Sequence, residues 1–254
     1  MPAVKTCPLD PADLVTRFHA EAIRQGFRVE PFGERDGVEL SAYTKRALGA
    51  KPRIYVTAGV HGDEPAPPQA LLEALAEGLF DDRATWFLIP MVNPAGYRLN
   101  HRENDQGIDL NRDYLTPLSP EVRGQVAWLQ RQPRFDLALC LHEDWEATGF
   151  YLYELARTAP LTFAQHVREA VASTLPIEPG DIIDGRPIDE PGIIRPENDP
   201  ALREQWPEAI YLFKHHTHHS LTFETPTALP LAGRITAHVA AIRVAIKLTV
   251  ASYP

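Results

Sequence analysis

The hydrophobic and polar positions of the chain repeat with two different periods, which predict helices and strands in turn. Near the N-terminus, apolar residues recur every three or four positions across residues 11–25, as they do on the buried face of an amphipathic helix. Asp10 can cap the start of this helix and Gly26 can end it. The predicted apolar stripe consists of Leu14, Phe18, Ala22 and Ile23.

The rest of the chain alternates between short apolar runs, which predict strands, and longer amphipathic runs, which predict helices. Residues 27–32 and 37–43 form a predicted hairpin. Further strands are predicted at 54–60, 86–92, 136–142, 150–155 and 220–226, and further helices at 65–79, 120–132, 160–173 and 235–253. This order favours an α/β fold with a mostly parallel or mixed sheet and helices on both of its faces.

Residues 175–207 interrupt this alternation. The stretch is rich in proline, glycine and acidic residues and has no clear periodicity, and it is too long for a simple connection in a compact domain. We interpret it either as a lid or pocket loop or as a surface excursion without a special role. Because the chain shows no internal repeat and no persuasive linker, residues 1–254 are predicted to form a single domain.

Composition and charge narrow the classes of partner. Of the 254 residues, 44% are hydrophobic and 23% are charged, as in ordinary soluble globular proteins. The formal net charge of −9 and the lack of a lysine and arginine cluster argue against nucleic acid as the main partner. The apolar stretch at 235–253 is interrupted by His238, Arg243 and Lys247, so we expect an amphipathic helix and no membrane partner.

The cysteine content indicates a reducing compartment. Cys7 and Cys140 are the two cysteines of the chain, too few for a disulfide framework in a protein of this size. The first residues lack a basic segment followed by an apolar stretch, which a secretory signal would have. The protein is therefore expected in the cytoplasm.

Two predicted strands end in candidate metal ligands. His61 and Glu64 follow one strand in a glycine-flanked turn, and His142 ends another. Open α/β sheets bind ligands at the carboxyl ends of their strands, and a catalytic zinc takes three protein ligands and leaves one position open. The spacing alone is weak, because His166 and Glu169 match it inside a predicted helix, where we interpret them as a surface contact. The alternative for His142 is a hydrogen-bonded core histidine.

The loop between residues 93 and 114 is crowded with arginine and asparagine. Arg102, Asn111 and Arg112 lie in it beside several glycines and prolines. Planar guanidinium groups with amide neighbours suit the capture of a carboxylate, and a loop that leaves a strand end beside a metal is well placed for that. The alternative is a solvated surface loop.

A carboxylate ends the last predicted strand. Alternation puts Ser220, Thr222 and Glu224 on one face of residues 220–226. An acidic residue on an apolar strand is costly unless it is solvated, paired or functional, so Glu224 is a candidate general base.

Two other features resemble metal ligands but favour simpler interpretations. The histidine run at 215–219 is expected to line a pocket or lie on the surface rather than hold a second metal. Cys140, on the same strand face as His142, is expected to be a small buried hydrophobe rather than a thiolate ligand.

Taken in order, the motifs HGDE, NPAGY, GIDLNRDY and FETP resemble the zinc carboxypeptidase, or metallocarboxypeptidase, family over about residues 54–226. The resemblance implies a three-layer α/β/α fold with a mixed, mainly parallel sheet. It also implies a role for each site residue: zinc ligands His61, Glu64 and His142, general base Glu224, oxyanion-stabilising Arg102, and substrate-carboxylate ligands Asn111 and Arg112.

The sequences of the HGDE and DLNR motifs resemble bacterial murein-peptide amidases, and the aspartoacylase and succinylglutamate desuccinylase branch, more closely than secreted digestive carboxypeptidases. We therefore expect a zinc-dependent hydrolase that cleaves an amide bond next to a free carboxylate, with a peptide or peptide-like substrate. An N-acyl amino acid is the alternative substrate, and a non-catalytic metal-binding relative is a third reading. Asp113 stands where many relatives have asparagine, and Tyr211 is only a guess for the tyrosine that closes over substrate in digestive members.

Overall fold

The centre of the molecule is one mixed β-sheet, seen in a computed structural model that describes residues 10–157, 163–188, 190–196 and 199–253. Its 8 strands lie in the order β1, β2, β4, β3, β5, β10, β6, β9. Their bounds are β1 (Arg28–Arg35), β2 (Val38–Lys45), β3 (Arg53–Thr57), β4 (Thr85–Ile89), β5 (Leu137–Asp144), β6 (Tyr151–Ala156), β9 (Ile193–Ile194) and β10 (His219–Pro226). The central strands β4, β3, β5 and β10 are parallel to one another, and β2 and β6 join them antiparallel.

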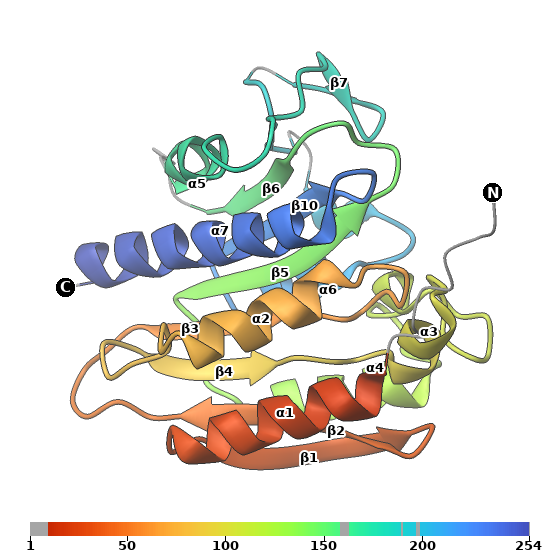
Figure 1. Cartoon of the computed structure of the whole chain (residues 1–254), viewed down its shortest axis with the longest axis vertical. Helices are drawn as coiled ribbons and strands as arrows, with labels where there is room; N and C mark the ends of the chain where they lie inside the picture. Colours follow the sequence, from red (N-terminus) through yellow and green to blue (C-terminus); the bar gives the residue numbers. More distant parts are fainter. Residues whose placement is uncertain (1–9, 158–162, 189, 197–198, 254) are drawn as a thin grey trace.

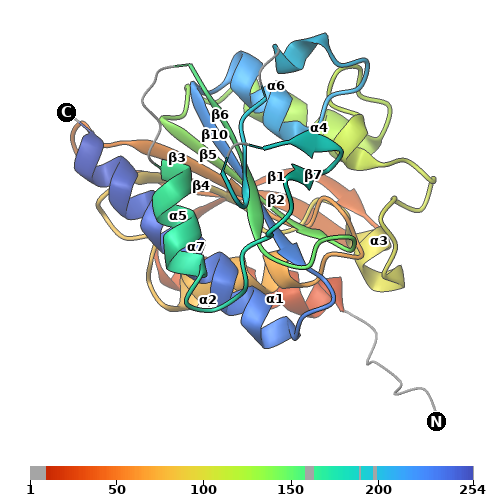
Figure 2. The ribbon, with the colours of Figure 1, turned by 90° about the horizontal axis from the view of Figure 1, so that it is seen from above.

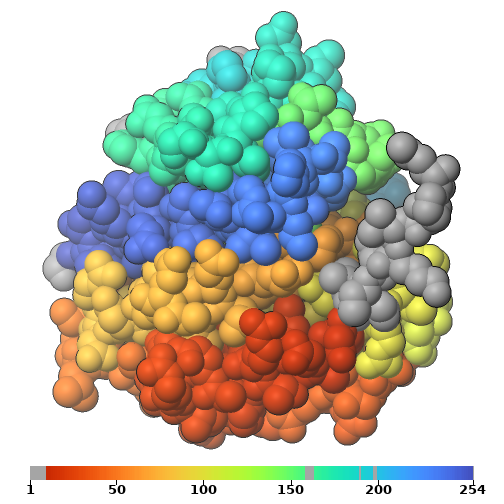
Figure 3. Space-filling model, in the orientation of Figure 1, coloured from red at the N-terminus to blue at the C-terminus, as the bar shows by residue number. Residues whose placement is uncertain are grey.

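Helices cover both faces of this sheet (Figures 1 and 2). One face carries α1 (Pro11–Arg24), α2 (Ala66–Ala76), α5 (Phe163–Val171) and α7 (Leu231–Ser252), and the other carries α4 (Pro120–Leu129) and α6 (Glu208–His215). Figure 3 shows the first group as successive bands over the sheet, with α1, α2, α7 and α5 in that order. The predicted three-layer α/β/α fold with a mixed, mainly parallel sheet is confirmed.

Strands β3, β4 and β5 each contribute to two hydrophobic cores, one under each helical layer. In β3, Ile54 and Val56 pack toward the α1 and α2 side, whereas Tyr55 between them packs with Trp128 and Phe135 on the other. This explains why these three strands are apolar on both faces, which is typical of parallel strands buried between helices.

The first helix begins as predicted, with the Asp10 carboxylate accepting hydrogen bonds from the backbone N–H groups of Ala12 and Asp13. One residue of its predicted stripe is wrong. Ile23 is 51% exposed, because it follows the buried Ala22 directly and each residue turns the side chain by about 100° around a helix axis.

The C-terminal helix α7 is long and apolar enough to cross a membrane by length and composition, with a mean hydropathy of 1.4. In this structure, however, it packs against the sheet, α2 and α5, with Ala241, Ile242 and Ala245 fully buried. The core helix of a globular protein meets the same criterion of length and composition.

Three described regions contain elements that the sequence did not predict. The arginine-rich loop contains α3 (Pro94–Leu99) and the short 3-10 helix η1 (Leu110–Arg112), and the stretch 175–207 contains the hairpin of β7 (Ile182–Ile183) and β8 (Arg186–Pro187), then β9, then η2 (Pro200–Leu202). The helix α6 was not predicted either. The predicted start of the helix at 160–173 and Cys7 lie outside the described residues.

Candidate active site

A cavity of about 620 Å³ opens at the carboxyl ends of β3, β5 and β10. Its wall includes all seven residues that the sequence singled out, which are His61, Glu64, Arg102, Asn111, Arg112, His142 and Glu224. The segment 175–207 forms part of the same wall through Asp184 and Arg186 at the tip of the β7–β8 hairpin and through Arg203 beyond η2. The volume lies within the range of small-molecule sites.

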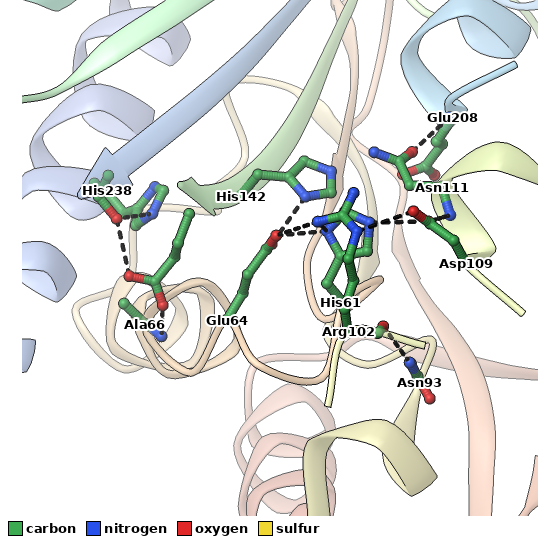
Figure 4. Close-up of polar contacts among 12 residues, drawn as sticks. His61, Glu64, Ala66, Asn93, Arg102, Asp109, Asn111, His142, Glu208 and His238 are labelled. Atoms are coloured by element: carbon green, nitrogen blue, oxygen red, sulfur yellow. Dashed lines mark hydrogen bonds and ion pairs between the residues drawn. The ribbon is translucent and has the colours of Figure 1, made fainter. Parts of the chain in front are cut away.

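Three side chains at the base of the cavity form a metal-binding group. Ligand atoms of His61, Glu64 and His142 all lie within 4.8 Å of one another, and all three residues are buried. The Glu64 carboxylate lies between the two rings, 2.5 Å from His61 Nδ1 and 2.9 Å from His142 Nδ1 (Figure 4). Two imidazoles and one carboxylate are a donor set of catalytic zinc sites, so these residues fit the ion that the sequence predicted.

The charges in this group depend on one another. Burial alone would raise the pKa of Glu64, but the charges and hydrogen bonds of His61 and His142 lower it below the usual carboxylate value. Burial alone would lower the pKa of His61, but Glu64 and Asp109 raise it. A cation bound among these atoms would find a carboxylate already ionised.

Asp109 is a site residue that the sequence analysis missed. One of its carboxylate oxygens lies 3.2 Å from His61 Nε2, and the other accepts a hydrogen bond of 2.9 Å from Arg102 Nε. Carboxylates that hold the far nitrogen of a ligating histidine fix the orientation of its ring. The sequence feature that could have identified Asp109 is its position in GIDLNRDY, two residues before Asn111. Its side chain also accepts a hydrogen bond from the backbone N–H of Asn111.

The three residues of the arginine-rich loop do not lie equally close to the metal-binding group. Arg102 Nη1 lies 3.2 Å from His61 Nδ1, so this guanidinium is next to the metal-binding group. Arg112 is exposed on the cavity wall and donates one N–H to the carbonyl of Asn111. Asn111 Oδ1 accepts the backbone N–H of Glu208 at 2.9 Å, so part of its amide anchors the start of α6.

Glu224 is held opposite His142. The two residues are direct partners in the parallel register of β10 and β5, and both side chains line the cavity. Within the described part of the chain, the Glu224 carboxyl makes no hydrogen bond or ion pair. Burial raises its pKa against the opposing effect of His142, and the negative charge of Glu64 raises it further.

The histidine run does not line the cavity, so the pocket alternative is wrong, whereas His215 and His218 are exposed on the surface, as the other alternative expected. His215 ends α6 and packs against Tyr211 with the two rings tilted, whereas His219 begins β10 and lies 3.1 Å from Glu154. Among the described residues the run forms no second metal-binding group. The guess for Tyr211 is wrong, because this residue is on the buried face of α6 and is absent from the cavity wall, where Tyr151 and Tyr153 lie instead.

Cys140 is buried as expected, and burial raises the pKa of its thiol well above the usual value. It belongs to the core between the sheet, α4 and α6. Cys140 is therefore a residue of the hydrophobic core and not part of the metal-binding group.

Gly62 determines how closely the ligand-bearing turn approaches α3. A Cβ atom at this position would lie 1.9 Å from the carbonyl carbon of Gly96 and 2.3 Å from the nitrogen of Tyr97. We expect Gly62→Ala to lower the free energy of unfolding by at least about 2 kcal/mol, since overpacking forces the backbone to move. Urea denaturation measures this effect. In the control Gly233→Ala the new methyl group would meet Leu175 at an ordinary 3.4 Å, and equal stability of the two variants would contradict the close approach.

Comparison with known proteins agrees with this geometry. Residues 34–120 match the sequence model of the zinc carboxypeptidase family. Carboxypeptidase SOL1 of Arabidopsis thaliana is 30% identical over 117 residues, which make up 37% of this chain. The chain covers 23% of the length of that plant protein.

Solved structures extend the similarity over nearly the whole chain. A candidate metallopeptidase from Shewanella amazonensis has a TM-score of 0.83 and 26% identity, over 95% of this chain and 94% of its own. The metallo-carboxypeptidase of Burkholderia cenocepacia shares the fold, with a TM-score of 0.69 and 18% identity over 94% of this chain and 69% of its own. The match of residues 34–120 to the zinc carboxypeptidase model, the fold shared with solved metallopeptidases and the group of His61, Glu64 and His142 all agree with the zinc-dependent hydrolase that the sequence predicted.

Proposed function

We propose that this chain is a metallocarboxypeptidase, which hydrolyses the amide bond next to a free carboxylate in peptides or peptide-like substrates. One observation carries the proposal. The buried group of His61, Glu64 and His142 shares a cavity with the carboxyl of Glu224, which the sheet holds opposite His142 and which has no partner among the described residues. A protein that only stored or carried metal would need no such carboxyl, which counts against the non-catalytic reading.

Each residue of the cavity has a chemical role in this proposal. His61, Glu64 and His142 would hold the zinc ion, which when bound would polarise the scissile carbonyl and lower the pKa of the attacking water. Glu224 would accept the proton of that water and return it to the leaving amine. Arg102, which Asp109 holds next to His61, would donate hydrogen bonds to the carbonyl oxygen as negative charge develops there.

The free carboxylate of the substrate would bind to Arg112 and Asn111. Arg112 uses one donor on the carbonyl of Asn111, and its remaining guanidinium donors can form a bidentate contact with a carboxylate. The Asn111 oxygen is engaged by Glu208, so the amide NH₂ is the half that remains available. Holding the terminal carboxylate there would fix which amide bond lies over the metal.

The role of Arg112 predicts how its loss changes substrate preference. Arg112→Met is expected to raise KM roughly 10- to 100-fold for peptides with a free C-terminal carboxylate, the value of one charged hydrogen bond. KM for the same peptides as C-terminal amides should change little. Steady-state kinetics on matched acid and amide pairs measures this, with the exposed Arg123→Met on α4 as control. An unchanged preference for the acid would remove Arg112 from the substrate site.

An N-acyl amino acid amidohydrolase is the second candidate, since the same residues could hydrolyse a small acylated amino acid. The cavity of about 620 Å³ is in the range that encloses drug-sized ligands, which suits a peptide better than an N-acetyl amino acid. A panel of short peptides beside N-acetyl and N-succinyl amino acids separates the two. Turnover of the acylated amino acids alone would favour the second candidate.

The proposed place of action is the cytoplasm. The support is the chain's two cysteines, of which Cys140 is a buried free thiol. Fractionation of cells that produce the full-length protein tests this, and recovery outside the cytoplasm would overturn it.

A further inference from the structure

A second buried carboxylate, Glu143, borders the cavity of the proposed active site beside His142. It follows His142 on β5, and because successive strand residues point to opposite faces, its side chain points toward the layer of α2 and α7. Its oxygens accept hydrogen bonds from three different segments. These are the Ala66 N–H at 2.7 Å, the Thr225 hydroxyl at 3.1 Å, and the guanidinium of Arg234.

Two of these contacts, and Glu143 itself, lie within two residues of a proposed site residue. Ala66 is the second residue after Glu64, Glu143 itself follows His142, and Thr225 follows Glu224. The two strands are paired so that Thr225 is opposite Glu143, just as Glu224 is opposite His142. One carboxylate therefore ties together the ligand-bearing turn and the two strand ends that carry the third ligand and the base.

The contacts of Glu143 with Ala66, Thr225 and Arg234, which we call the junction, require an acceptor with two oxygens. The Ala66 N–H is the unsatisfied start of α2, whose N-cap residue Pro65 offers no side-chain hydrogen bond, so Glu143 supplies the negative charge that a helix N-terminus favours. Arg234, in the first turn of α7, balances that charge. His238 Nε2 lies 3.1 Å from the Thr225 hydroxyl and continues the network into α7, and Figure 4 shows Ala66 and His238 on the side of Glu64 away from Asp109.

Another buried ion pair in the same sheet shows what a purely structural role would look like. Glu154 on β6 is as deeply buried as Glu143, and it pairs with Arg195 and His219. It is not in the cavity wall, and its partner on β10, His219, lies at the far end of that strand from Glu224. Replacing either glutamate should destabilise the fold, but only one should change the site.

We propose that Glu143 is a positioning residue, which holds the turn of Glu64 and the strand ends of His142 and Glu224 in one arrangement. The proposal rests on the proposed function of these three residues. It assigns Glu143 no contact with substrate. Its effect passes through backbone and hydroxyl contacts, so it should appear in zinc affinity and in turnover together.

The test compares zinc affinity, kinetics and stability in Glu143→Gln and Glu154→Gln. An amide has one acceptor oxygen and turns its NH₂ group toward a donor, so Glu143→Gln should lose part of the junction. We expect its zinc dissociation constant, measured by chelator competition, to rise about 10- to 100-fold, as it does when residues that support metal ligands are replaced in other proteins. We also expect kcat to fall while KM stays close to that of the wild type. Glu154→Gln should lose comparable thermal stability and keep the wild-type zinc affinity and kcat.

A second variant keeps the proposal testable if Glu143→Gln does not fold. Thr225→Val removes only the hydroxyl beside Glu224, so it should lower kcat and leave the zinc dissociation constant unchanged. Wild-type zinc affinity and kcat in Glu143→Gln, or wild-type kcat in Thr225→Val, would overturn the positioning role. Failure of the unaltered protein to bind zinc would instead overturn the proposed function, so the two failures are distinct.

Discussion

Replacing Glu224 with glutamine is expected to lower kcat by about 10²- to 10⁴-fold, the usual contribution of a general acid and base, without loss of zinc. The amide keeps the size of the carboxyl but cannot accept the proton of the attacking water. Because Glu224 is outside the group of ligand atoms, the metal content should stay at the wild-type value. Peptide hydrolysis and metal analysis on the same preparation measure both quantities.

The matched control for this variant is Glu169→Gln, the same substitution at an exposed position of α5. It should hydrolyse peptides at the wild-type rate. Full activity in a zinc-loaded Glu224→Gln would sink the assignment of the base. Loss of zinc in that variant would show that Glu224 is a ligand and not a base.

Removing either histidine of the metal-binding group should abolish stable zinc binding. Both His61→Ala and His142→Ala delete one of three converging donors and leave Glu64 with one neighbouring ring. We expect the zinc dissociation constant to rise by more than the roughly 100-fold that loss of an outer partner costs. Zinc per chain after dialysis against a chelator, together with a competition titration, measures the effect.

The chain contains its own control for this experiment. His166 lies three residues before Glu169, the same spacing as His61 and Glu64, but it is exposed on α5. His166→Ala should retain all of its zinc. Either His61→Ala or His142→Ala with full zinc occupancy would remove that residue from the ligand set.

The parts of the site that the sequence predicted are those that depend on strand order and strand ends. A local pattern identifies the apolar strands around Ile54 and Leu139 and the polar residues that follow each of them. These two strands are parallel neighbours, so their carboxyl ends lie at one edge of the sheet. The structure does bring His61, Glu64 and His142 together there. The fold class followed from the same alternation.

The parts that the sequence missed depend on contacts between distant segments. Asp109 is 48 residues from His61, and nothing in its local pattern distinguishes it from a turn residue. The short helix α6 has 8 residues, fewer than an isolated helix needs for stability, so tertiary packing determines it. The division of the histidine run between the end of α6 and the start of β10 was not predicted for the same reason.

The register between β5 and β10 fixes the position of Glu224 relative to His142, whereas part of the cavity wall lies outside this pairing and can vary. A slip of one residue would turn Glu224 to the opposite face of the sheet, so the spacing of base and metal ligands is held by the backbone ladder. Asp184 and Arg186 of the cavity wall belong to the β7–β8 hairpin, which is outside that ladder. Exchange of this hairpin should therefore redirect the enzyme to other substrates without rebuilding its hydrolytic centre, which makes the hairpin a natural point for divergence among relatives and for laboratory evolution.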